Sequence, residues 1–353
     1  MEWLLVIIAV LTCAALAFRT FRQYLNKRAF AVQGPHKIDE RFFVRIGGIE
    51  QWIQIRGEDK TNPVLLILHG GRALSYMSFT ALFRSWERHF TIVHWDRRGV
   101  GRTFGRNRRT GHGGVRLSQI VADGIELAHW LRKRLQKDKL ILLGHSMGSI
   151  VGVMMAKERP DLFHLYIGAE QVVAMSQNET VSYELISAKL HATGNRKNLI
   201  ALEKVGPPPY PNERQWLRKQ KLMKMLDPAY RRMVQRIIPS MLIFSPVYSL
   251  TDLLDFLAAN RFSGQHLFED WMAFDAATLG NQLEMPVLVI QGETDIMAPT
   301  ALAREWVAHL EAPDKAFVTI QSRGHLSLFM VPDLFLEKLV VTLRSIGLTQ
   351  KSC

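Results

Sequence analysis

The amino-acid sequence predicts an α/β fold whose mostly parallel, twisted sheet is flanked by helices and interrupted by a helical insertion. Short apolar runs, typical of strands covered on both faces, alternate with helix-period segments in the first half of the chain and again near its end. Between these regions the alternation stops and helical patterns replace it. We therefore expect a sheet domain made of residues 35–171 and 282–349, with a helical cap at 172–281.

The expected elements follow from this alternation. Arg41 to Gly57 hold two alternating apolar runs around Gly47-Gly48, which is typical of an antiparallel hairpin. Buried strands are expected at residues 63–71, 90–99, 139–145, 162–170, 286–295 and 316–325, and helices at 117–136, 150–159, 300–312 and 333–346. Parallel strands end on one rim of a sheet, so a cap inserted between two of them forms a lid over that rim.

One motif on that rim carries a chemical prediction. The apolar run ending at Leu143 leads into Gly144-His145-Ser146-Met147-Gly148, which has the G-x-S-x-G pattern of a nucleophile elbow. Such a sharp strand-to-helix turn exposes the serine hydroxyl, and the glycines allow the strand and helix backbones to pass closely. Ser146 is therefore the candidate nucleophile, and it needs a general base and a group to orient that base.

Later strand ends supply both partners. In this kind of site the acid and then the histidine follow the serine along the chain. Asp295 ends the apolar run 286–295, and His325 ends the run 316–325. Asp270 and Asp314 are rival acids, but neither terminates an apolar strand. We expect His325 to be the base and Asp295 the orienting acid.

Two backbone N–H groups are expected to stabilise the negative charge that develops on a reacting carbonyl oxygen. Residues 69–71 read "HGG" at the end of an expected strand, so Gly71 can offer one N–H group. Met147, the first residue of the helix after the elbow, can offer the other. These residues are the predicted oxyanion hole.

With these motifs in place, the chain resembles the α/β-hydrolase superfamily and, within it, the proline iminopeptidase group. The similar pieces, in family order, are "HGG" (69–71), "WDRRGVGRT" (95–103), "GHSMGS" (144–149), "YIGAEQVV" (166–173), "GPPPYP" (206–211), "GETD" (292–295) and "GH" (324–325). They span the chain from about Ile38 to its end. The resemblance implies an α/β-hydrolase fold with a lid, and the roles of nucleophile, acid and base for Ser146, Asp295 and His325.

The chain departs from that group in two places. The group usually continues "HGG" with proline and glycine, whereas Arg72-Ala73 stands here. Aminopeptidases of the group use acidic lid residues to hold the free amino group of the substrate, and Glu170, Glu179 and Glu184 lie near the start of the cap without matching that role clearly. The substrate-binding candidates are Arg72, Glu170 and Glu179.

Several other polar residues have plainer explanations. The resemblance implies that His69 and His145 shape loops around the site, and Asp96 is expected to brace a turn. The arginine-rich stretch 97–114 holds one aromatic residue, Phe104, so we expect a solvated or membrane-facing basic loop and not a nucleic-acid site. Aromatic residues of the cap could line a pocket or form its packing core; they are Trp216, Phe256, Phe262 and Trp271.

The N-terminus predicts membrane attachment. The run from Trp3 to Phe18 has no charge and is followed by Arg19, Arg22, Lys27 and Arg28. We expect residues 1–18 to be a single-pass anchor and 19–34 a basic linker, with the sheet domain on the cytoplasmic side by the positive-inside rule. The alternative is an exported protein after cleavage of a signal near Ala17, but no Lys or Arg precedes the apolar run as a signal requires.

Composition excludes some classes. The net charge of +13 suits membranes, nucleic acids or acidic ligands, and does not choose among them. The two cysteines, Cys13 and Cys353, cannot form a disulfide scaffold or a multi-cysteine metal site. We see no phosphate-binding glycine loop, dinucleotide motif or metal-ligand cluster, so we expect no cofactor and no metal. The composition does not indicate an oligomeric state.

The sequence therefore predicts a serine hydrolase that cleaves a small ester, amide or short peptide and is attached to a membrane. Aminopeptidase activity like that of proline iminopeptidases is one form of this prediction. Carboxylesterase or lipase-like activity, or cleavage of a lactone or carbon–carbon bond on the same fold, is the alternative. A membrane-bound binding protein without catalysis is a third hypothesis from a different class.

Overall fold

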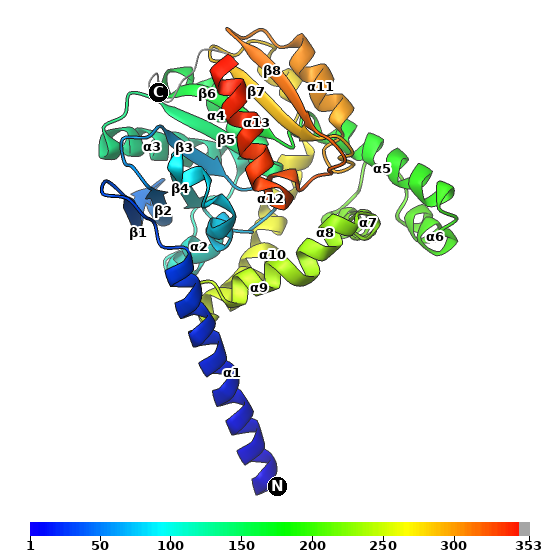
Figure 1. The fold of residues 1–353 in the computed structure, drawn as a ribbon. Helices are drawn as coiled ribbons and strands as arrows, with labels where there is room; N and C mark the ends of the chain where they lie inside the picture. Colours follow the sequence, from blue (N-terminus) through cyan, green and yellow to red (C-terminus); the bar gives the residue numbers. More distant parts are fainter. Residues whose placement is uncertain (346–353) are drawn as a thin grey trace.

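The computed structural model describes residues 1–345 and contains one eight-stranded sheet (Figure 1). The strand order is β1-β2-β4-β3-β5-β6-β7-β8. β1 pairs with β2 and β2 pairs with β4 in antiparallel orientation, and the remaining pairs are parallel. The strands are β1 (Ile38–Ile46), β2 (Ile49–Gly57), β3 (Val64–Leu68), β4 (Thr91–Asp96), β5 (Leu140–His145), β6 (Phe163–Ala169), β7 (Val287–Gly292) and β8 (Lys315–Ile320). The predicted α/β-hydrolase fold class is confirmed.

The sheet separates two hydrophobic layers. Successive residues of β3 and β5 point to opposite faces, so that Leu66 and Leu142 pack in one layer and Ile67 and Ile141 in the other. The first layer includes residues of α3 (Leu117–Leu135), α4 (Met147–Glu158) and α11 (Thr300–His309). The second includes residues of a 3₁₀ segment (Tyr76–Phe83), α12 (Ser327–Met330) and α13 (Pro332–Ser345). Burial on both faces explains why these strands are apolar throughout.

Residues 172–281, which we call the cap segment, contain no strand. The chain enters and leaves this segment beside an isolated bridge between Ala174 and Asp275. Its helices are α5 (Met175–Ala192), α6 (Arg196–Val205), α7 (Glu213–Leu226), α8 (Pro228–Arg232), a π-helical turn (Met233–Ile237), α9 (Ile238–Ile243), α10 (Leu250–Met272) and a 3₁₀ turn (Ala276–Leu279). The predicted end of the sheet domain at residue 349 lies outside the described residues.

The N-terminal helix α1 (Glu2–Ala29) is longer than the predicted anchor and projects from the body of the molecule (Figure 1). Residues 19–34, expected as a linker, are helical through Ala29. Side chains spaced along one face of α1 hydrogen-bond to carbonyl oxygens after α9: Arg19 to Tyr248 (2.9 Å), Gln23 to Ser245 (2.6 Å) and Asn26 to Phe244 (3.0 Å). These contacts explain why the basic segment is ordered as a helix.

The arginine-rich stretch 97–114 is only in part the solvated basic surface we expected, since Arg106, Arg108 and Arg109 are exposed but the start of the stretch is not. Residues Gly101–Asn107 form helix α2, and the side chains of Arg97 and Arg98 are buried. Arg98 donates hydrogen bonds to both carboxylate oxygens of Asp123, at 2.9 and 3.0 Å. Buried arginines need such partners, so the first two cations of this stretch serve the interior of the fold.

Candidate active site

Ser146 occupies a sharp turn between β5 and α4. Its backbone has φ 53° and ψ −124°, a region that residues with a side chain rarely adopt. A Cβ atom on Gly144 would lie 2.6 Å from the carbonyl oxygen of Gly148, and one on Gly148 would lie 2.7 Å from that of His69 and nearer still to that of Leu68. The glycines are therefore required by close backbone contact, as the elbow motif predicts.

Asp295 and His325, predicted from later strand ends, lie together with Ser146 in the structure. His325 Nε2 is 2.8 Å from Ser146 Oγ, and His325 Nδ1 is 2.8 Å from Asp295 Oδ2. All three residues are buried, with 8%, 4% and 3% of Ser146, His325 and Asp295 exposed. The other oxygen of Asp295 accepts backbone N–H bonds from Met297 (2.8 Å) and Ala298 (3.0 Å), which fix the carboxylate.

The charge of Asp295 stabilises the protonated form of His325. Burial lowers the pKa of His325, but the Asp295 carboxylate outweighs burial through its charge and its hydrogen bond, so the pKa is raised above its ordinary value. A histidine that readily accepts a proton from the neighbouring hydroxyl suits a general base.

The loop after β3 is held in place around the predicted oxyanion site. Gly71 has φ +67° and, like Met147, lines the cavity next to Ser146. The buried Arg97 donates to the carbonyl oxygens of Gly71 (3.3 Å) and Arg72 (2.9 Å). Burial lowers the pKa of Arg97 to about 10. These hydrogen bonds turn the two carbonyl groups toward Arg97 and so orient the loop. The sequence analysis had assigned Arg97 to the surface.

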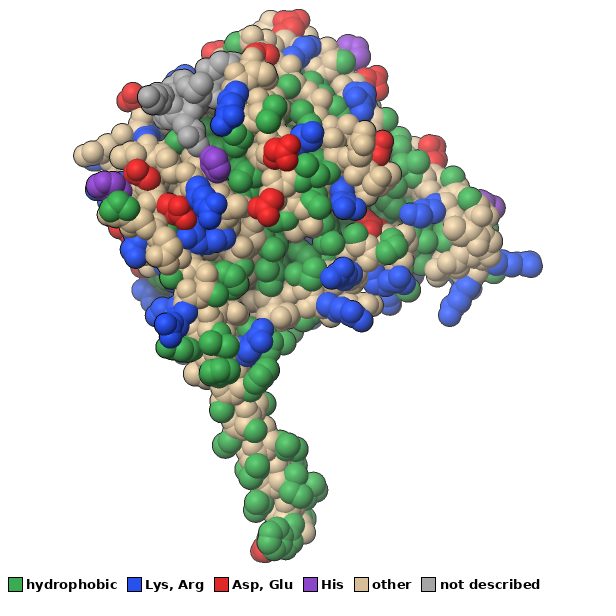
Figure 2. All heavy atoms as spheres, viewed as in Figure 1, with side chains coloured by type: hydrophobic (Ala, Val, Ile, Leu, Met, Phe, Trp, Pro, Cys, Tyr) green, Lys and Arg blue, Asp and Glu red, His purple; other side chains and the backbone are tan. Residues whose placement is uncertain are grey.

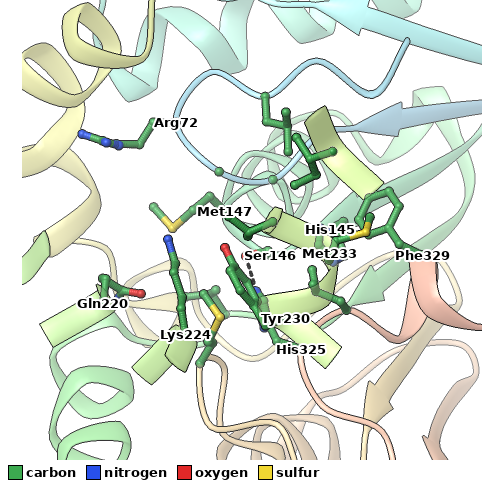
Figure 3. Close-up of a pocket in the computed structure, with 18 of the residues that line it drawn as sticks. Arg72, His145, Ser146, Met147, Gln220, Lys224, Tyr230, Met233, His325 and Phe329 are labelled. Carbon is green, nitrogen blue, oxygen red and sulfur yellow. Dashed lines mark hydrogen bonds between the residues drawn. The ribbon is translucent and has the colours of Figure 1, made fainter. Parts of the chain in front are cut away.

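A cavity of about 370 Å³ lies over Ser146, between the sheet rim and the cap segment (Figure 3). Most of its wall is apolar; the apolar lining residues include Leu74, Phe79, Val172, Met175, Trp216, Leu217, Met233, Val234, Ile238, Phe256, Met297, Leu326 and Phe329. Trp216 and Phe256 line this cavity, whereas Trp271 belongs to the core and Phe262 packs on Phe104. An elongated apolar group fits such a wall.

The substrate-binding candidates are placed differently from one another. Arg72 lines the cavity and pairs with Glu213. Glu179 also lines it, but its oxygens accept hydrogen bonds from Trp216 (3.0 Å), Lys219 (2.7 Å) and Gln220 (3.3 Å). A free amino group would therefore have to displace donors that Glu179 already holds.

The assignment of Glu170 as a substrate-binding residue is wrong in this structure. Glu170 is fully buried behind the cavity, accepts a hydrogen bond from Ser327, and lies 3.1 Å from His145 Nε2 without the alignment of a hydrogen bond. Glu170 directly follows β6, and its side chain is buried against Ser327 and His145. The exposed Glu184 does not line the cavity either.

The remaining polar candidates have structural contacts. His145 Nδ1 lies 2.5 Å from Tyr76 Oη, which in turn accepts the N–H of Gly70 at 2.8 Å. Burial lowers the pKa of His69 to about 3, so this ring is neutral. Burial also raises the pKa of Asp96 to about 6, and Asp96 accepts the N–H of Arg102 at 2.9 Å at the start of α2. These residues shape loops, as expected.

The sequence analysis did not identify Lys224 and Tyr230 as residues of the cavity wall. Lys224 on α7 and Tyr230 on α8 both line the cavity, and the Lys224 ammonium lies 5.3 Å from the centre of the Tyr230 ring. No motif marks them, because their positions depend on how the cap helices pack. Among residues 1–345, no group of three or more His, Cys, Asp or Glu side chains is arranged to hold a metal ion.

The fold and the site define a hydrolase of the α/β class. The chain belongs to the alpha/beta hydrolase family, whose sequence pattern matches residues 64–338. It is 29% identical over 298 residues to a protein of Bacillus subtilis (strain 168) named probable aminopeptidase YbaC, covering 83% of this chain and 93% of that protein. These similarities confirm two predictions: that the protein is a hydrolase, and that it resembles the proline iminopeptidase group.

Solved structures of low identity share the fold. A proline iminopeptidase of Mycobacterium smegmatis superposes with a TM-score of 0.61 and 20% identity, over 88% of this chain and 99% of that one. A membrane phospholipase A described as a bacterial virulence factor superposes with a TM-score of 0.60 and 16% identity, over 99% of both chains. The fold is thus shared by hydrolases with different names.

Proposed function

We propose that the protein is a serine hydrolase in which Ser146 is acylated and then released by water. The observation that supports this most directly is the series of two 2.8 Å contacts from Ser146 through His325 to Asp295. A serine hydroxyl is a weak nucleophile without a base, and here the base is aligned and its other nitrogen is held by a carboxylate.

The steps follow from these positions. His325 Nε2 accepts the Ser146 proton as Oγ attacks the carbonyl carbon of an ester or amide. The N–H groups of Gly71 and Met147 would stabilise the oxygen that becomes negative. His325 then donates its proton to the departing oxygen or nitrogen, which leaves an acyl-Ser146. Water loses a proton to His325 and attacks the acyl carbon, and His325 then returns that proton to Ser146 Oγ as the acid leaves.

The two substrate classes each have one supporting observation. The similarity to a named aminopeptidase favours an amide or short peptide with a free N-terminus. The apolar wall of the cavity favours an ester with a hydrocarbon acyl group. Both use the same chemistry at Ser146, so the class of reaction does not depend on which substrate is natural.

We also propose that α1 anchors the protein in a membrane, with the sheet domain on the cytoplasmic side. Within residues 1–345, α1 is the helix whose length and composition suit a membrane span, and its apolar side chains are exposed. Next to its base, Leu250, Leu254 and Leu257 of α10 are exposed at 46%, 67% and 67%. Exposed Arg231, Arg232 and Arg236 lie on the adjoining cap helices, and blue side chains are visible along the underside of the cap in Figure 2. An apolar surface with basic residues beside an anchor suits a membrane interface.

The test of the enzymatic proposal is covalent labelling of the full chain in detergent. A fluorophosphonate should add its mass to the wild-type protein and not to a Ser146→Ala variant that melts at the same temperature. Absence of labelling in a folded wild-type sample would contradict the proposal and favour a binding protein. Anchoring is tested by whether the protein stays in the membrane fraction after washing with high salt and carbonate.

A further inference from the structure

Three charged side chains besides the histidines line the cavity over Ser146: Arg72, Glu179 and Lys224. Arg72 is paired with Glu213, and Glu179 is paired with the buried Lys219. Lys224 has no ion-pair partner among residues 1–345, and the nearby Asp227 carboxylate instead accepts the N–H groups of Ala229 and Tyr230 at 2.8 and 3.1 Å. The cavity lining therefore contains one charged side chain without an ion-pair partner, and that charge is positive.

Lys224 extends into the cavity. In Figure 3 its side chain rises from α7 toward the side where Ser146 and Met147 lie, whereas Arg72 points away from Ser146. The ammonium lies 5.3 Å from the centre of the Tyr230 ring, and this cation–π contact holds it over the cavity. A half-buried ammonium in a largely apolar wall gains more from an anionic ligand than an exposed lysine does, since water screens it less.

The acid in the same wall does not offer a matching site for a cation. Glu179 is almost fully buried and both of its oxygens already accept hydrogen bonds, one of them from an ammonium at 2.7 Å. A substrate ammonium would meet an occupied carboxylate on one side and the like charge of Lys224 on the other. The cavity thus differs from one built to hold a free N-terminus.

We propose that Lys224 binds an anionic group of the substrate, a carboxylate or a phosphate, so that the natural substrate is an ester or amide carrying both an apolar chain and an anion. This inference rests on the proposed hydrolase function and narrows its substrate class. Lys224 is a specificity-determining residue that contacts substrate outside the bond that is cleaved.

The turnover test compares three p-nitrophenyl esters with five-carbon acyl chains that end in a methyl, a carboxylate or an ammonium group. The wild-type protein should give the highest kcat/KM for the carboxylate ester and the lowest for the ammonium ester. In Lys224→Met the ratio of kcat/KM for the carboxylate ester to that for the methyl ester should fall about tenfold or more, mainly through KM. Lys224→Arg should retain most of the ratio.

The matched control is Lys221→Met, which removes an exposed cation from the same helix. This variant should keep the wild-type ratio, because Lys221 does not line the cavity. An unchanged ratio in a folded Lys224→Met protein would overturn the proposal. A wild-type protein that prefers the ammonium ester would also overturn it, whatever the variants do.

A binding test separates this inference from the proposed chemistry. Calorimetry with the full-chain Ser146→Ala variant in detergent measures hexyl phosphate, hexanoate and hexylamine below their micellar concentrations. Hexyl phosphate or hexanoate should bind at least tenfold more tightly than hexylamine, and the added change Lys224→Met should remove the difference. The stronger of the two anions identifies whether phosphate or carboxylate is the preferred group.

The two tests fail independently. Selective anion binding without fluorophosphonate labelling of the wild type would refute the hydrolase proposal while supporting the anion site. Labelling of Ser146 together with equal binding of hexylamine and the anions would support the hydrolase proposal and refute the anion site.

Discussion

The sheet side and the cap side of the cavity differ in what fixes the positions of their side chains. On the sheet side, Ser146 follows β5 directly in a tight turn, and His325 lies in the loop after β8, where Asp295 holds its ring. On the cap side, Trp216 and Lys224 project from α7, and their positions depend on how short helices pack on one another. The sheet wall therefore holds the residues of the proposed chemistry, and the cap wall shapes the space that a substrate would occupy.

The largest expected effect is on the sheet side. Replacing His325 with Ala should lower hydrolysis of any accepted ester by several orders of magnitude, about 10⁴-fold or more, because Ser146 loses its base. Steady-state kinetics with a wild-type melting temperature as the control measures this. Turnover close to wild type would show that His325 is not the base and that the sheet side does not provide the chemistry as proposed.

A large effect on stability is expected inside the cap. Lys219→Met would leave Glu179 buried without its cationic partner, and breaking a buried pair in this way costs about 3–5 kcal/mol. Chemical denaturation should show this loss, and Lys221→Met on the same helix should not. A neutral Lys219→Met variant would show that neither the stability of the cap nor the Glu179 carboxylate depends on this pair.

A comparable effect tests the backbone contacts of the sheet wall. Gly148→Ala places a Cβ atom against the carbonyl oxygens of Leu68 and His69, so we expect a loss of about 3 kcal/mol in the free energy of unfolding. Gly114→Ala is the control, since an added Cβ there meets open space. A Gly148→Ala protein as stable as wild type would show that the elbow tolerates more movement than its contacts imply.

The smallest expected effect is a shift in a pH profile. His325 acts as a base only when neutral, and Asp295 raises its pKa, so kcat/KM should fall on the acid side with a midpoint above the ordinary histidine value of 6.5. A pH–rate profile with a neutral ester measures the midpoint. A midpoint below 6.5 would mean that burial prevails over Asp295 at this residue.

Sequence reasoning succeeded where local constraints are strong and failed where distant packing decides. Residue 146 and its glycines form a local turn, and Asp295 and His325 follow strands that the apolar runs reveal. Glu170 was misassigned because it is an acidic residue near the start of the cap, yet its side chain is fully buried. The buried Arg97 was assigned to the surface because it begins an arginine-rich stretch.

The positions of the strands along the chain, the elbow and the series Ser146, His325 and Asp295 could be predicted from the sequence, because strand ends of a parallel sheet meet on one rim whatever covers them. The pairing of Glu179 with Lys219 and the unpaired charge of Lys224 could not be read in this way. Glu179 lies on α5 and both lysines lie on α7, among other charged residues, and only the packing of these helices determines which charges face one another and which face the cavity.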